Sequence, residues 1–168
     1  MKTNEFLITV LRFILLILVQ VILLNNINLM GYVNPYIYLI FIILYPFDSS
    51  RELLIFLSFL LGITIDIFDN SGGIHAAASV FTAYIRPVVL KYSFGISYEY
   101  DAIKLERSSF AEKFSYIASL VFIHHLVLFL LEAFSFRHMV LVLKSVLFSG
   151  LFTLVVIFGT LTLFKRSK

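Results

Sequence analysis

The stretch GITIDIFDNSGGIH, residues 62–75, places an aspartate and a polar turn inside one of the most apolar parts of the chain. Mainly Leu, Ile and Phe precede it, and three alanines, Val80 and Phe81 follow it. Asn-Ser-Gly-Gly at 70–73 is typical of a tight turn, since Asn and Gly tolerate left-handed backbone angles. The stretch therefore predicts two apolar helices joined by a turn, with Asp66 inside the first helix.

The composition predicts an integral membrane protein. Of the 168 residues, 61% are apolar and only 14% are charged, whereas a soluble domain has roughly 25% charged residues. The mean hydropathy is +1.01. The length allows one compact bundle. The absence of cysteine excludes disulfides and thiolate metal sites.

The apolar runs predict a single all-α transmembrane domain over residues 1–168, a bundle of six spans. A helix needs about 20 apolar residues to cross a bilayer core about 30 Å thick. The expected spans are 6–24, 36–47, 53–69, 74–90, 114–131 and 139–164, with a cytoplasmic loop at 91–113. The second span is short and lies between Pro35 and Pro46, so five spans plus a short re-entrant segment is the alternative.

The sequence gives further predictions for the first span and for the 91–113 loop. The first span lacks a small-residue cleavage site, which indicates an uncleaved anchor helix and not a signal peptide.

The 91–113 loop mixes charges of both signs, with Ile103, Phe110 and Phe114 at spacings of seven and four residues. It is either in part a helix lying on the membrane surface or a solvated linker.

Positive charges predict the orientation, because Lys and Arg in short loops favour the cytoplasm. With six spans, one side carries ten positive residues and the other carries only Arg137. The ten are Lys2, Arg51, Arg86, Lys91, Lys104, Arg107, Lys113, Lys165, Arg166 and Lys168. With five spans, the eleven residues, Arg137 included, would divide nine to two. The C-terminus and the 91–113 loop are therefore expected in the cytoplasm, and with six spans the N-terminus as well.

Asp66 belongs to a polar stripe. Positions 58, 62, 66 and 70 are each four residues apart, so Ser58, Gly62, Asp66 and Asn70 share one helix face. Small and polar residues let membrane helices approach closely and hydrogen-bond to each other. Similar stripes are His75-Ser79-Ala83 and Ser145-Ser149-Thr153. The stripe predicts a buried face, on which Asp66 bonds a neighbour such as Arg12, Lys144 or His124.

A proton relay or ion site at Asp66 is the competing interpretation. A relay usually has several acids at membrane depth, whereas Asp66 stands almost alone, so a structural role is preferred. The adjacent His124 and His125 point about 100° apart on a helix and cannot ligate one metal together. One is expected to bond inside the bundle while the other faces lipid or a partner.

No catalytic residue, cofactor site or metal site is predicted. The sequence has no G-x-S-x-G nucleophile motif. The basic residues at the C-terminus are a topological signal and not a nucleic-acid footprint. The sequence therefore contains no recognisable enzyme motif.

Several motifs in a fixed order carry a family resemblance. They are the short second span, the G-x-x-x-D helix from Gly62 to Asp66, the glycine turn leading into IHAAASVFTAYIRP, and the run HHLVLFLLEAFSFRH at 124–138. Over essentially its whole length the chain resembles the bacterial rod shape-determining MreD family, in the version found in Bacteroidota-type bacteria. The fold of that family is similar to the substrate-binding subunits of energy-coupling-factor transporters.

The resemblance implies a non-enzymatic inner-membrane subunit of the cell-elongation and peptidoglycan-synthesis machinery. The implied direct partner is MreC, with MreB, RodA and a penicillin-binding transpeptidase in a larger assembly and no nucleic acid. The structural or partner-docking candidates are Ser58, Gly62, Asp66, Asn70, Gly72, Gly73 and His75. The alternative function is a vitamin-like small-molecule-binding subunit of a transporter, which would place a polar pocket beside Asp66, Asn70 and His75.

Overall fold

The computed structural model describes residues 3–25, 27–47, 49–95, 108–134 and 139–163. Within these ranges the regular structure is helical, apart from one isolated β-bridge between Leu29 and Val33. The elements are α1 (Thr3–Val19), the π-helical turn η1 (Gln20–Leu24), α2 (Leu39–Leu44), α3 (Arg51–Asp69), α4 (Ile74–Phe94), α5 (Phe110–Ala133) and α6 (Met139–Leu163).

The long helices lie where the hydropathy pattern predicts them. Leu7–Leu24, Phe110–Ala133 and Met139–Leu163 are long and apolar enough to cross a membrane, which supports the prediction of an all-α membrane protein. The α3 and α4 helices, of 19 and 21 residues, occupy the predicted third and fourth spans. The six-span bundle itself is not confirmed, because the predicted span 36–47 contains only the six helical residues of α2. Six residues rise only about 9 Å.

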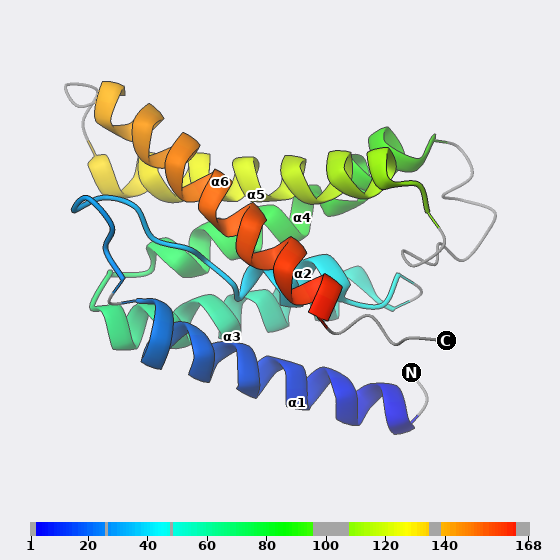
Figure 1. Ribbon diagram of the computed structural model, residues 1–168. Coiled ribbons are helices and arrows are strands. Elements are labelled where there is room, and N and C mark those ends of the chain that lie inside the picture. The colour runs from blue at the N-terminus through cyan, green and yellow to red at the C-terminus, as the bar shows by residue number, and fades with distance from the viewer. Residues whose placement is uncertain (1–2, 26, 48, 96–107, 135–138, 164–168) are drawn as a thin grey trace.

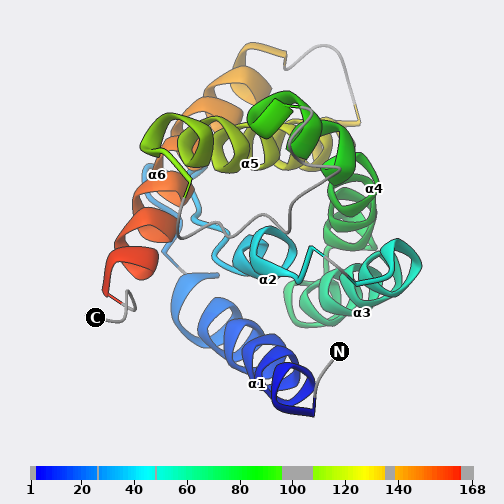
Figure 2. The same cartoon turned by 90° about the vertical axis from the view of Figure 1, so that its right-hand side faces the viewer.

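The short helix α2 occupies the middle of the bundle. Viewed along the helices, α1, α3, α4, α5 and α6 surround it (Figure 2). Residues 32–47, here called the central segment, enter at the end where η1 finishes and leave at the end where α3 begins (Figure 1). The start of α1 and the end of α6 lie at one end of the bundle (Figure 1). Most side chains of the central segment are buried, and Tyr38, Leu39, Ile42 and Ile43 are fully buried.

Side chains of neighbouring helices satisfy the backbone at the start of the central segment. The N–H of Ile37 donates to Oε1 of Gln20 at 2.9 Å, and the N–H of Tyr36 donates to Oγ1 of Thr153 at 3.0 Å. The Nε2 of Gln20 also donates to the Pro35 carbonyl. A non-helical backbone is tolerated at membrane depth only where the protein supplies such partners.

Arginines and a tyrosine satisfy the other end of α2. Nη1 of Arg12 donates to the Leu44 carbonyl at 3.0 Å, Nη2 of Arg86 donates to the Tyr45 carbonyl, and the Tyr116 hydroxyl donates to the Ile43 carbonyl at 3.0 Å. The last carbonyls of a helix have no partner within it and carry partial negative charge, so cations are favourable there. Three helices, α1, α4 and α5, therefore cap one short helix.

Arg86 is not one of the cytoplasmic positive charges that the sequence predicts. Its side chain is inside the bundle at 5% exposure, so it is not a loop charge and does not count toward the cytoplasmic side. The loop after α4 is also shorter than predicted, because α4 runs to Phe94 and α5 begins at Phe110. The surface helix or linker expected there falls largely in 96–107, outside the described residues.

Candidate functional site

The turn at residues 70–73 joins α3 and α4, whose backbones are in direct contact. A Cβ atom placed on Gly62 would lie 2.4 Å from the Cα of Ala76 and 2.6 Å from the His75 carbonyl oxygen. Asn70 ends α3 with φ at 54°, and its N–H donates to the Asp66 carbonyl. Gly72 and Gly73 follow with φ of 68° and 96°, angles that favour glycine. Glycine therefore sets both the spacing and the turn of the hairpin.

Asp66 caps the first turn of α4. Its carboxylate accepts the N–H of His75 at 3.0 Å, the N–H of Ala76 at 2.8 Å and the hydroxyl of Ser71. The first N–H groups of a helix lack partners within it, and the positive end of the helix dipole stabilises an anion there. The N-cap residue of α4 is Gly73, so the buried aspartate supplies from α3 the acceptors that the first N–H groups of α4 need.

The expected partners of Asp66 are wrong. Arg12 bonds the Leu44 carbonyl, Lys144 is exposed on α6, and His124 bonds Tyr38. The reason is that the tight turn brings free backbone N–H groups next to the carboxylate. Pairing oppositely charged side chains in the sequence cannot predict a bond to the backbone.

The polar stripes face the bundle interior, with one exception. Ser58, Gly62 and Asp66 are buried, as are both other predicted stripes. Asn70 is exposed, because it is the C-cap of α3 and has left the helical path. Of the candidates for partner docking, Asn70 and Gly72 are exposed and the buried members already contact this chain.

Asp66→Asn is expected to lower stability by about 1–2 kcal/mol, since an amide offers one acceptor oxygen where two N–H groups need both carboxylate oxygens. The measurement is the midpoint of thermal unfolding of purified protein in detergent. Glu52→Asn, at an exposed position in the first turn of α3, is the matched control. Equal midpoints for Asp66→Asn and the wild type would rule out the capping role.

A second polar cluster lies between the central segment, α4 and α5. The Tyr38 hydroxyl lies 2.9 Å from Nδ1 of His75 and 2.9 Å from Nε2 of His124. Nε2 of His75 lies 3.5 Å from the Asp69 carboxylate, which can only accept, so the His75 proton belongs on Nε2. Tyr38 then donates to His75 and accepts from His124. Nδ1 of His124 is buried without a hydrogen-bond partner in the described structure.

The expectation that one of the paired histidines faces lipid or a partner is wrong, since both are fully buried. Nδ1 of His125 lies 2.7 Å from the Val121 carbonyl, and Nε2 lies 3.1 Å from Oγ1 of Thr153 on α6. The α5 helix packs on both α4 and α6. His125 therefore contacts α6, while His124 faces the central segment and α4.

Tyr36 and Tyr38 were not predicted to belong to a site. The ring of Tyr36 contacts the rings of His75 and His125, with centroids 5.5 Å and 5.2 Å away. The available signal is the pattern Pro-Tyr-Ile-Tyr at 35–38, which places two hydroxyls at the start of a short apolar run. Buried hydroxyls need partners, but the sequence does not reveal that the partners are histidines.

Tyr38→Phe is expected to lower stability by about 1–3 kcal/mol, because it leaves two buried imidazole nitrogens without their hydrogen bonds. Thermal unfolding in detergent measures the change. Tyr92→Phe, at a residue 80% exposed near the end of α4, is the matched control and should change nothing measurable. A Tyr38→Phe protein as stable as the control would show that the hydroxyl does not join the two rings.

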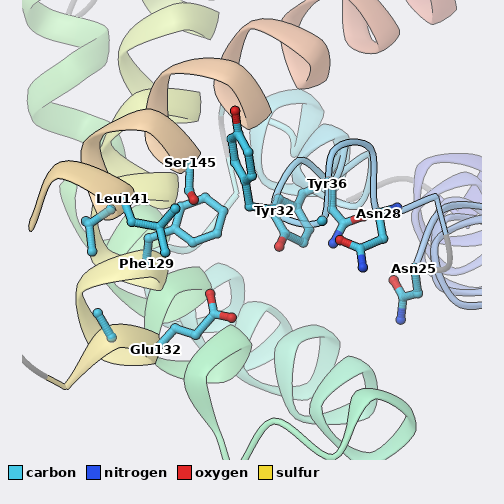
Figure 3. Close-up of a pocket in the computed structure, with 12 residues that line it drawn as sticks. Asn25, Asn28, Tyr32, Tyr36, Phe129, Glu132, Leu141 and Ser145 are labelled. Atoms are coloured by element: carbon cyan, nitrogen blue, oxygen red, sulfur yellow. Dashed lines mark hydrogen bonds between the residues drawn. The ribbon is translucent and has the colours of Figure 1, made fainter. Parts of the chain in front are cut away.

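A cavity of about 640 Å³ lies beside this cluster, at the end of the bundle where η1 finishes. Residues of the η1–α2 connection, the end of α5 and the start of α6 line it (Figure 3). Asp66, Asn70 and His75 are not among its lining residues, although Tyr36 belongs both to the cavity wall and to the ring cluster.

The comparisons with known proteins do not identify the chain. It matches no protein-family model, no curated protein and no solved structure. In the described ranges no group of three or more His, Asp or Glu side chains could hold a metal ion. The site is therefore interpreted from its own geometry and from the motifs of the sequence.

Proposed function

We propose that the chain is a non-enzymatic, MreD-like subunit of the bacterial cell-elongation machinery in the inner membrane. One observation supports this most directly. Gly62, Asp66 and His75 belong to the motifs that carry the resemblance, and they form the contact between α3 and α4: Gly62 packs on the backbone of α4, and the Asp66 carboxylate accepts the N–H of His75. Gly72 and Gly73 form the turn between the two helices. A motif devoted to holding two helices together suits a scaffold that presents fixed surfaces to partners.

The proposed topology has six crossings with both termini in the cytoplasm. Arg51, Lys91 and Lys113 lie where α3 begins, α4 ends and α5 begins, all at one end of the bundle (Figure 1). Positive residues favour the cytoplasmic side. The second crossing is made by the central segment, which is only partly helical and depends on the side-chain partners that α1, η1, α4, α5 and α6 supply.

MreC is the proposed direct partner, and it would pack against outward-facing helix surfaces. The small-residue stripes are buried within this chain, so a partner's helix cannot insert there without opening the bundle. The outer faces carry large apolar side chains, among them Leu11 on α1, Val88 on α4 and Val155 on α6, each at least 61% exposed. Lateral contact in the membrane is the mode of association that such surfaces permit.

Single cysteines test this proposal, because the natural chain contains none. Leu11→Cys, Val88→Cys and Val155→Cys, each labelled with a photo-crosslinker, sample three faces in membranes that also contain tagged MreC. One face is expected to crosslink strongly, while Ser58→Cys, at a buried position, should not. Failure of MreC to co-purify, together with no crosslink from any face, would overturn the proposed partnership.

The competing function, a small-molecule-binding transporter subunit, requires a pocket beside Asp66, Asn70 and His75. Asp66 and His75 are buried and bonded within the hairpin, and they do not line the cavity of about 640 Å³ found in the described residues. The scaffold function is therefore preferred.

A further inference from the structure

The cavity beside the central segment has the volume of a small-molecule site. Its volume of about 640 Å³ falls within the range of roughly 300–1,000 Å³ that small-molecule pockets occupy. Phe129, Leu141 and Val142 form an apolar side, and three asparagines, two tyrosines, Ser145 and Glu132 supply polar groups. Polar residues therefore make up more than half of the lining, which suits a polar or charged ligand.

The loop that closes one side of the cavity is held by specific bonds. The side chain of Asn34 accepts the N–H of Asn28 at 2.7 Å, and Leu29 and Val33 pair through both their backbone groups. At its ends, Asn25 donates to Asp69 at 2.9 Å and the N–H of Asn34 donates to Ser149 at 3.2 Å. The wall is therefore formed before any ligand arrives, which lowers the entropic cost of binding.

The charge of the cavity has one sign among its described residues. Glu132 projects its carboxylate from the end of α5 toward Tyr36 (Figure 3). It is exposed and forms no ion pair with a described residue. No lysine or arginine is among the lining residues. Asp69, which holds Asn25 at the edge of the cavity, adds a second carboxylate nearby.

We propose that this cavity binds a small organic cation through a primary ammonium group. An ammonium has three donors and no acceptor, and Glu132, the asparagine carbonyl oxygens and the Tyr36 hydroxyl are acceptors for it. Tyr36 and Phe129 also line the cavity, and aromatic rings attract both cations and apolar groups. The inference goes beyond the proposed scaffold function and does not depend on the MreC complex.

The ammonium group has two possible sources at this end of the bundle. One is a water-soluble amine that enters from the proposed outer side. The other is the ethanolamine headgroup of a membrane lipid that enters between α5 and α6. Both present the same chemistry to Glu132, so the test contains one arm for each source.

The experiment uses the full chain in detergent and in lipid nanodiscs. In detergent, 2-phenylethylamine is titrated against its uncharged analogue 2-phenylethanol, with binding followed by calorimetry and by the thermal unfolding midpoint. In nanodiscs, phosphatidylethanolamine is compared with phosphatidylcholine. We expect saturable stabilisation by the amine or by phosphatidylethanolamine, and at least a fivefold weaker response to the uncharged analogue.

Glu132→Gln is expected to weaken binding of the effective probe at least fivefold, whereas Glu52→Gln at the opposite end should leave it unchanged. Stabilisation confined to phosphatidylethanolamine supports the lipid source, and stabilisation by the free amine supports the soluble source. Equal responses to the amine and to the alcohol, no response in either arm, or an unaltered Glu132→Gln protein would each overturn the ammonium site. None of these results bears on crosslinking to MreC, so the two proposals fail separately.

Discussion

Gly62→Ala is expected to destabilise the protein by about 3 kcal/mol, the upper end of the usual cost of overpacking a core. The added Cβ would lie 2.4 Å from the Cα and 2.6 Å from the N of Ala76. Both are backbone atoms and cannot rotate away, so α3 and α4 must separate. That separation also pulls the Asp66 carboxylate from the N–H groups of His75 and Ala76.

The matched control for this change is Gly159→Ala on α6. A Cβ there meets nothing within 4 Å, and replacing glycine by alanine inside a helix normally gains up to about 1 kcal/mol. The two substitutions are chemically identical and are expected to shift the thermal unfolding midpoint in opposite directions. A Gly62→Ala protein at least as stable as the wild type would mean that the two helices do not touch at this position.

Arg86→Met is expected to cost about 2–4 kcal/mol, since it leaves buried polar groups without partners. Its guanidinium bonds the Tyr45 carbonyl through Nη2 and the Tyr116 hydroxyl through Nε at 2.8 Å, and it lies 4.8 Å from the ring centre of Phe47. Methionine fills similar space but donates nothing to the end of α2. No lipid group can replace the lost donors at membrane depth.

The measurement is thermal unfolding in detergent, with limited proteolysis near residue 47 as a local readout of the central segment. Lys144→Met removes a positive charge from an exposed position on α6, and it should change stability by less than about 0.5 kcal/mol. Arg86→Lys should recover only part of the loss, because an ammonium cannot reproduce the fork of the guanidinium. Equal stability of Arg86→Met and Lys144→Met would refute the capping role of Arg86.

For Asp66, the local sequence pattern predicts burial but not the hydrogen-bond partners. The four-residue spacing correctly predicts that Ser58, Gly62 and Asp66 are buried. It does not identify the partner, because the acceptor's bonds go to backbone N–H groups that every helix start possesses. The same limit applies to Arg86, which looks like a loop charge in the sequence and becomes buried only because α2 ends beside it.

For the short second span, the sequence predicts the break in the helix but not its place in the bundle. The two prolines and the length of 36–47 correctly raise doubt about a full helix, and α2 has only six residues. They do not reveal that the segment runs through the centre of the bundle, since that position depends on Gln20, Arg12, Tyr116 and Thr153, which are remote in sequence. The cavity escapes prediction for the same reason, because its walls come from three separate parts of the chain.

By itself the sequence determined the long apolar helices typical of a membrane protein, their positions, and the sharp turn after Asn70. These follow from hydropathy, length and backbone angles, which act over one or two helical turns. Only the tertiary structure decided where the polar side chains go: Asp66 to the start of α4, two arginines to the end of α2, and two histidines to the interior. The reason is that a polar atom removed from water must find whichever donor or acceptor the packing brings near it.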